Sequence, residues 1–216
     1  SHIFLRVGDY QASAEVNETA SEVDRKYIER SGAKGIYPLM YYSHNLHFVA
    51  YVRTMQGKFG EAMDYARRLS RNVDGAVDGM PMLAPYGTFE WLVLTRFGKW
   101  KEMLAEPKPK EKTPYLHAMY CYARGLSFAS LANVPDAQAE RERLGAIVAK
   151  IPETDHLMIN STRSVLAIAM ADLDARIARA RNRGDEEVAH LKMAVELQDQ
   201  LGYMEPPEWH YPEREA

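Results

Sequence analysis

The stretch GKFGEAMDYA, residues 57–66, decides how this chain folds. Gly57 can adopt the left-handed backbone conformation that ends a helix, which other residues adopt only at a cost. The aromatic Phe59 then opens a second helix, and the small side chains of Ala62 and Ala66 let that helix approach the first closely. The pattern predicts two antiparallel helices joined by a tight turn. Such a pair cannot bury its whole apolar face alone, so we expect it to stack on its neighbours.

The same phrase, a glycine followed by a charged residue and an aromatic, recurs along the chain. Two further copies are Gly8-Asp9-Tyr10 and Gly98-Lys99-Trp100. Weaker versions are Asn133-Val134-Pro135 and Gly184-Asp185-Glu186. Successive phrases are separated by about 35 to 51 residues. A repeated phrase of this kind predicts a series of helix pairs of related design, with insertions between some of them.

Apolar periodicity and helix breakers place the expected helices. We expect helix pairs at residues 37–72, 83–105, 114–150 and 155–201, with partial repeats at 1–30 and 207–216. The last pair is expected to begin with a long helix from Asp155 to Arg183. Residues 1–7 look like the end of one helix. Pro207 stands where the first turn of another would begin, since proline is favoured there. The expectation is one all-α domain, cut within a repeat at both ends.

These features resemble tetratricopeptide-repeat (TPR) proteins, whose repeat period is about 34 residues. A narrower resemblance, to a group of longer and mostly bacterial TPR proteins, rests on four segments. They are SHIF at 1–4, YSHNLHF at 42–48, RFGKW at 96–100 and EPPEW at 205–209. The resemblance spans nearly the whole chain and implies a right-handed α-solenoid of antiparallel helix pairs. It implies no particular activity, because one fold can carry many functions.

Composition argues against several classes of function. The chain has 216 residues and a formal net charge of −3, which gives no support to a general nucleic-acid binder. The run of arginines at positions 176, 179, 181 and 183 has acidic neighbours, which weakens that role further. Cys121 is the only cysteine, so neither an internal disulfide nor a cysteine zinc cluster can form. No apolar run is long enough to span a bilayer, and the cytoplasm is the favoured compartment.

The first helices of several expected pairs carry polar stripes that a binding surface needs. The predicted ligand-binding residues are Tyr51, Glu90, His117, Tyr120, Arg124, Asn160 and Arg163. First helices of stacked repeats line the concave surface of a solenoid, so these side chains are expected to share one groove. Arg124 and Arg163 would hold a carboxylate or phosphate bidentately, with Asn160 as a hydrogen-bonding partner. The alternative is that each stripe makes separate solvent or interhelical contacts.

Two histidines raise the possibility of a metal site. His44 and His47 are three residues apart on one expected helix, so they share a face. Imidazole nitrogen binds zinc, but a site needs at least three protein ligands, and His2 is our candidate for the third. Other candidates for that position are Glu90, His117 and His210. The alternative is that both histidines pack between helices.

The sequence therefore leaves three classes of function open. The leading hypothesis is a TPR-type binding scaffold whose polar and aromatic groove binds a peptide, a protein or a small anionic ligand, without a cofactor. The second is a metal-binding protein or metal-dependent enzyme that uses a divalent transition metal. The third is a segment that positions attached domains. Neither nucleic acid nor membrane is an expected partner, and the sequence does not indicate an oligomeric state.

Overall fold

The computed structural model describes residues 1–216 and contains ten α-helices and no β-strand, which confirms the all-α prediction. The chain divides into two compact units, Ser1–Val93 and Leu94–Ala216. Each unit has its own core of helices. None of the helices is long and apolar enough to cross a membrane.

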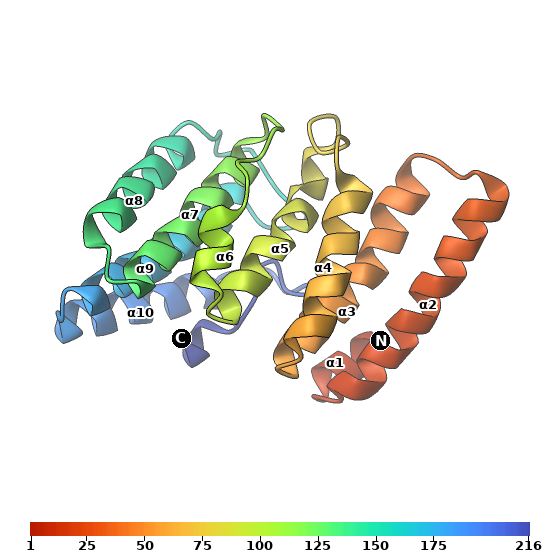
Figure 1. The fold of residues 1–216 in the computed structure, drawn as a ribbon, viewed down its shortest axis with the longest axis horizontal. Helices are drawn as coiled ribbons and strands as arrows, with labels where there is room; N and C mark the ends of the chain where they lie inside the picture. Colours follow the sequence, from red (N-terminus) through yellow and green to blue (C-terminus); the bar gives the residue numbers. More distant parts are fainter. The chain divides into compact units, whose positions relative to one another are not determined.

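The first unit is built around α3, which packs between α2 and α4 (Figure 1). Its helices are α1 (His2–Arg6), α2 (Tyr10–Ser31), α3 (Ser43–Met55), α4 (Phe59–Val73) and the first part of α5 (Ala84–Arg96). A π-helical turn, Tyr37–Tyr42, leads into α3, and a 3₁₀ turn, Pro81–Leu83, leads into α5. Leu46 and Phe48 of α3 and Leu69 of α4 are fully buried. The apolar character of α3 all round thus follows from its place between two helices.

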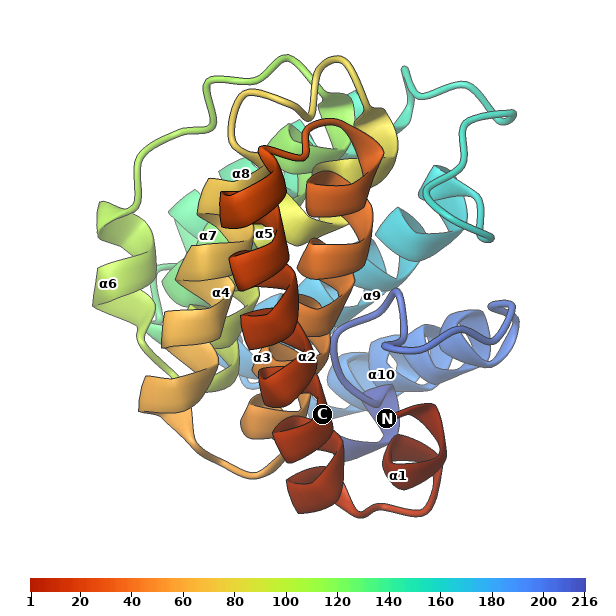
Figure 2. The ribbon, with the colours of Figure 1, turned by 90° about the vertical axis from the view of Figure 1, so that its right-hand side faces the viewer.

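The second unit is built around α7 and α9 in the same way. Its helices after α5 are α6 (Trp100–Ala105), α7 (Pro114–Ser130), α8 (Val134–Val148), α9 (Thr162–Ala180) and α10 (Gly184–Asp199). α7 packs against α8 and α9, and α9 packs against α10. A methyl group at Gly125 of α7 would lie 2.6 Å from Leu173 of α9, so the glycine allows the two helices to come close. The segment after α10 folds back along that helix and ends in a 3₁₀ turn, Glu213–Glu215 (Figure 2).

Five helix-to-helix turns share one backbone geometry. A residue with positive φ ends the first helix in each, and these residues are Gly8, Gly57, Gly98, Ala132 and Asn182, with φ between 58° and 76°. The amide of the next residue then donates to the carbonyl five positions earlier at 2.9–3.0 Å, as from Lys58 to Arg53. This bond across a left-handed residue is the Schellman motif, which satisfies a carbonyl left open at the helix end. The three predicted glycine turns are confirmed. At the two weaker phrases the left-handed residue is Ala132 or Asn182.

The long helix expected from Asp155 begins later, at Thr162. Residues before it form a closed loop, because the amide and hydroxyl of Thr162 both donate to Asp155, at 3.0 and 2.5 Å. The Ser161 hydroxyl accepts from the Ser164 amide at 3.4 Å and caps the helix. The prediction that Asn160 shares a helical stripe with Arg163 is therefore wrong, since Asn160 precedes the helix.

The helix expected to open at Pro207 is also not formed. Only the short 3₁₀ turn Glu213–Glu215 is helical in this segment. Its main chain is held instead by Gln198 of α10, whose amide donates to the Tyr211 carbonyl at 3.0 Å and accepts from the Glu213 amide at 2.8 Å. A backbone bonded to a neighbouring helix has no need of its own helical hydrogen bonds.

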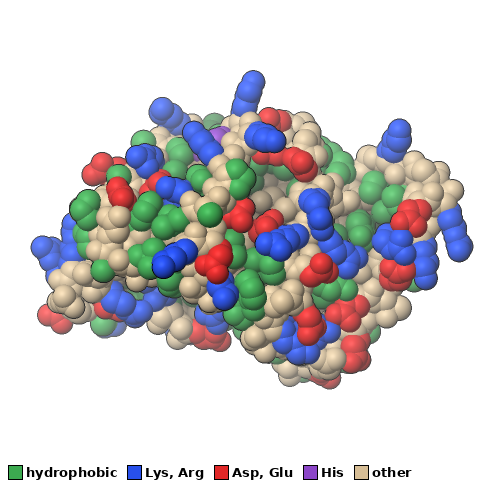
Figure 3. Space-filling view, viewed as in Figure 1, with side chains coloured by type: hydrophobic (Ala, Val, Ile, Leu, Met, Phe, Trp, Pro, Cys, Tyr) green, Lys and Arg blue, Asp and Glu red, His purple; other side chains and the backbone are tan.

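On the face shown in Figure 3, Lys and Arg lie interspersed with Asp and Glu. Many of them form ion pairs, such as Arg25 with Glu22 at 2.7 Å and Arg141 with Asp174 at 2.8 Å. An exposed pair such as Arg25 with Glu22 contributes little to stability.

Gly57 provides a direct test of the turn geometry. A Cβ added there would meet no atom within 4 Å, so only the backbone conformation, at φ 73°, opposes a side chain. We expect Gly57→Val to destabilise the protein by about 1–2 kcal/mol and to lower the melting temperature. Gly60 is the matched control, because it lies in α4 with equally open surroundings and no positive φ. Gly60→Ala should leave the melting temperature unchanged or raise it. An unchanged melting temperature for Gly57→Val would contradict the account.

Candidate functional site

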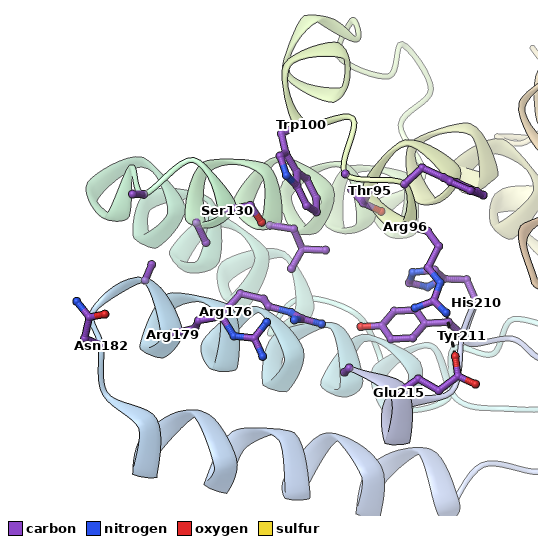
Figure 4. Close-up of a pocket in the computed structure, with 17 residues that line it drawn as sticks. Thr95, Arg96, Trp100, Ser130, Arg176, Arg179, Asn182, His210, Tyr211 and Glu215 are labelled. Carbon is purple, nitrogen blue, oxygen red and sulfur yellow. Dashed lines mark hydrogen bonds and ion pairs between the residues drawn. The ribbon is translucent and has the colours of Figure 1, made fainter. Parts of the chain in front are cut away.

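The second unit contains a pocket of about 910 Å³, shown in Figure 4. We call it the arginine pocket, after the three arginines that line it, Arg96, Arg176 and Arg179. The other residues that line it and carry polar groups or rings are Thr95, Phe97, Trp100, Ser130, Asn182, His210, Tyr211 and Glu215. Its volume lies within the range of about 300–1,000 Å³ that is usual for ligand sites.

Three of the repeated turns border this pocket. Their left-handed residues, Gly98, Ala132 and Asn182, all line it. These residues end α5, α7 and α9, so equivalent positions of successive helix pairs meet around one cavity. A helix C-terminus carries partial negative charge, which cations next to it offset. Arg96 and Arg179 lie in the last turns of α5 and α9 and provide such cations.

Each arginine of the pocket also has an acidic partner. Arg96 pairs with Glu215 at 2.9 Å, and its guanidinium lies 5.1 Å from the centre of the Tyr211 ring. Arg179 pairs with Glu187 at 2.5 Å and is about half exposed. These two pairs are near the surface, where exchange for another anion costs little.

Arg176 is held differently from the other two arginines. Its Nε donates to Asp172 at 3.2 Å, and Asp172 has no exposed surface. The second oxygen of Asp172 accepts from the Tyr122 hydroxyl at 2.7 Å. A buried carboxylate is tolerated only when it is paired in this way. In Figure 4 the forked end of Arg176 is directed into the pocket, beside the Tyr211 hydroxyl.

His210 adds an unsatisfied group to the pocket wall. The side chain is 5% exposed, and its Nδ1 is buried without a hydrogen-bond partner. Burial, with a smaller contribution from Arg96, lowers the pKa of His210 to about 3, so the imidazole is neutral at physiological pH. A buried polar atom without a partner costs about 1–3 kcal/mol. A ligand that paired with Nδ1 would remove that cost.

The carboxyl-terminal segment is anchored by aromatic and acidic groups. Trp209 is 1% exposed, and its indole Nε1 donates to Glu213 at 2.5 Å. The Trp209 ring lies 5.4 Å from the Tyr122 ring and 4.8 Å from the His210 ring, measured between centroids. This packing fixes His210 and Tyr211 at the edge of the pocket.

The predicted metal ligands lie in the first unit. The rings of His2 and His44 stack with centroids 5.7 Å apart, and both contact Phe48 edge-on. His47 is buried against Tyr86 and Phe89 instead, with the Phe89 ring 4.6 Å away. Burial, with a smaller contribution from His44, lowers the pKa of His47 to about 3. No group of three or more His, Cys, Asp or Glu side chains is arranged to hold a metal ion.

Two other predicted residues also lie in the first unit. Tyr51 is buried within α3. Glu90 of α5 pairs with Arg67 of α4 at 3.0 Å. The Glu90 carboxylate is thus paired, as expected for a partly buried charge.

Arg124 and Arg163 cap helices rather than standing free. Arg124 donates to Glu140 at 3.0 Å and to the Leu104 carbonyl, at the end of α6, at 3.2 Å. Arg163 donates to the carbonyls of Ala149 and Ile151, just after α8, at 3.1 and 2.6 Å. Open carbonyls at a helix end attract cations in this manner. Both arginines therefore already use donors that the sequence prediction reserved for a ligand.

Asn160, His117 and Tyr120 are likewise bonded within the chain. Asn160 accepts from the Gly202 amide at 2.7 Å and donates to Glu208. His117 Nε2 lies 2.8 Å from the Glu111 carbonyl, which can only accept. The Tyr120 hydroxyl donates to the Glu106 carbonyl at 2.8 Å. His117 and Tyr120 line a second pocket together, which neither Asn160 nor the helix-capping arginines border.

Sequence reasoning missed the residues that define the arginine pocket. From the sequence, Arg176 and Arg179 served only to argue against nucleic-acid binding, because acidic residues surround them. One signal was present: Asp172 lies in an otherwise apolar run of α9, four residues before Arg176. A carboxylate in that position needs a buried partner, and the i, i+4 arginine supplies one.

No protein-family model, curated protein or solved structure matches this chain. The resemblance to TPR proteins therefore stays a prediction from the segments that carry it. Function must be inferred from the residues of the chain itself.

Glu213 makes stability depend on pH. Burial, followed by the nearby Asp172 carboxylate, raises the pKa of Glu213 to about 8, although Trp209 and Arg176 act in the opposite direction. Folding therefore favours the protonated, uncharged form of the Glu213 carboxyl group. The contribution of this group to stability is complete below its ordinary pKa of 4.5 and is lost as the pH rises towards 8.

We expect Glu213→Gln to remove this dependence. The variant and the wild type should melt at similar temperatures at pH 4.5, and the variant should melt a few degrees higher at pH 8. Thermal unfolding followed by circular dichroism across this range is the measurement. Glu186→Gln, at a half-exposed position, is the control and should show no such pH-dependent difference. A difference between Glu213→Gln and wild type that stayed constant with pH would contradict the assignment.

Proposed function

We propose that this chain is a TPR-like binding scaffold and that its arginine pocket holds an anionic group of its ligand. The ligand would be a peptide, a protein or a small molecule that presents a carboxylate or a phosphate. The observation that carries the proposal is the pocket itself: three arginines line one cavity of ligand size, and His210, whose buried Nδ1 has no hydrogen-bond partner, is part of its wall. Guanidinium groups bind such anions bidentately.

The proposed architecture is a right-handed α-solenoid of antiparallel helix pairs. Five turns with one geometry support it, because a repeated turn joins repeated pairs. The meeting of Gly98, Ala132 and Asn182 at one pocket supports it further. Stacked repeats bring equivalent positions to the same side. Scaffolds of this kind act by binding partners, and we place this one in the cytoplasm.

The roles proposed for the three arginines follow from how each is held. Asp172 holds Arg176 by Nε, so the guanidinium has a fixed orientation before a ligand arrives. Such preorganisation lowers the entropic cost of binding. Arg179 and Arg96 have only near-surface partners, Glu187 and Glu215, which an incoming carboxylate would replace. The neutral His210 would then pair with a hydroxyl or amide of the same ligand.

The groove expected from the sequence remains part of the proposal. Within the second unit, His117 and Tyr120, which line a cavity, would extend the contact to a longer peptide. The helix-capping arginines, Arg124 and Arg163, would contribute through the segments that they hold in place. The metal-dependent alternative rests on the stacked His2 and His44 rings. Elemental analysis of protein prepared without a histidine tag would contradict it by finding no transition metal.

Calorimetric titration with succinate, inorganic phosphate and an acidic peptide tests the anion site. We expect at least one of these probes to bind with one-to-one stoichiometry. Arg179→Gln should then lower the affinity about tenfold, equivalent to about 1.4 kcal/mol, because one charge-assisted contact is lost.

Arg183→Gln is the matched control for that experiment. Arg183 follows α9, is about half exposed and pairs with Glu186 at 3.2 Å, but it does not line the pocket. Its replacement changes net charge equally and should leave the affinity unchanged. Equal loss in both variants would show that only net charge matters, and the absence of binding by all three probes would reject the site.

A further inference from the structure

A second cavity of about 500 Å³ lies in the same unit, between α7 and α8, which Figure 1 shows side by side. We call it the lysine pocket. The residues that line it are Lys108, Pro114, His117, Tyr120, Cys121, Arg143, Ala146, Ile147 and Lys150. None of them lines the arginine pocket. The two cavities are therefore separate candidate sites.

The walls of the lysine pocket are mainly apolar. Pro114, Ala146 and Ile147 present hydrocarbon, and the Tyr120 hydroxyl is already bonded to the Glu106 carbonyl. Cys121 also belongs to this surface. Burial, with a smaller contribution from Glu140, raises the pKa of the Cys121 thiol to about 12, so the sulfur is uncharged at physiological pH. A neutral thiol behaves as a small hydrophobic group and not as a nucleophile.

The charges that line the pocket are all positive. Lys108, Arg143 and Lys150 contribute cations, and no aspartate or glutamate lines the cavity. Arg143 pairs with Glu140 at 2.9 Å. Lys108 and Lys150 are exposed and form no ion pair. The cavity therefore carries an excess of positive charge, although the net charge of the chain is −3.

We propose that the lysine pocket binds a small amphiphilic anion, with its apolar chain against Ile147 and Cys121 and its carboxylate at Lys108 and Lys150. An apolar molecule without charge would leave the two lysines without an anionic partner. A small anion without an apolar part would leave the cavity wall exposed to water, whereas burial of apolar surface favours binding. A ligand with both parts satisfies both features.

Octanoate, octanol and acetate separate these possibilities. Octanoate has both the chain and the charge, octanol has only the chain, and acetate has only the charge. In calorimetric titration of the folded chain we expect octanoate to bind one-to-one, at least tenfold more tightly than either of the others. Its affinity should fall as salt is raised, because exposed charges are screened.

Replacement of the two lysines tests their role. The double variant Lys108→Ala, Lys150→Ala should bind octanoate at least tenfold more weakly and should remain folded, since both side chains are exposed. Arg183→Gln, at a half-exposed arginine that lines neither pocket, is the control and should leave octanoate binding unchanged. The proposal is overturned if octanoate shows no binding at millimolar concentration or if octanol binds equally well. It is also overturned if the double variant binds as the wild type does, or if Arg183→Gln weakens binding as much.

Discussion

One residue in the left-handed backbone conformation closes each helix pair, and the rest of the structure depends on it. The bond across that residue, 2.9 Å from the Lys58 amide to the Arg53 carbonyl in one case, ends the first helix and sets the direction of the second. Glycine adopts this conformation without cost, but Ala132 adopts it at φ 58° against a penalty of about 1–2 kcal/mol. The packing of α7 on α8 must therefore supply that energy. Because three of these turns, at Gly98, Ala132 and Asn182, border the arginine pocket, the repeated turn forms part of the cavity wall.

The buried charge of Asp172 links this architecture to the pocket. A carboxylate without exposure is stable only with partners, and Tyr122 and Arg176 provide them from α7 and α9. The same contact fixes the orientation of Arg176. Burial keeps His210 neutral and raises the pKa of Glu213, so the region beneath the pocket holds fewer charges than its composition suggests. The positive charge of the arginines at the cavity, with neutral groups beneath them, favours an anionic ligand.

The sequence predicted the all-α class, most helices and the glycine turns, because each depends on local residues. Gly8, Gly57 and Gly98 have the expected positive φ. The turn after α7 was predicted from the weaker phrase Asn133-Val134-Pro135, but the left-handed conformation of Ala132 could not be, since alanine carries no such signal. The start of α9 was misplaced because Asp155 bonds to Thr162 and closes a loop that has no periodicity of its own.

The candidate site was harder to predict because its contacts join distant parts of the chain. Asp172 meets Tyr122, fifty positions away, and Arg179 meets Glu187 on the next helix. Polar stripes identified His117 and Tyr120, which do line a cavity. The polar stripes could not show that Arg124 and Arg163 cap helix ends. Only the folded structure determines which backbone carbonyls are left without a helical partner and can accept from an arginine.

The most direct test of the central claim is an NMR titration that follows the arginine Nε and histidine ring nitrogens of the labelled protein as succinate or an acidic peptide is added. The account predicts shifts at Arg96, Arg176, Arg179 and His210, with Arg25 and Arg71 unaffected. Shifts spread evenly over all the arginines, or confined to those outside the pocket, would contradict it.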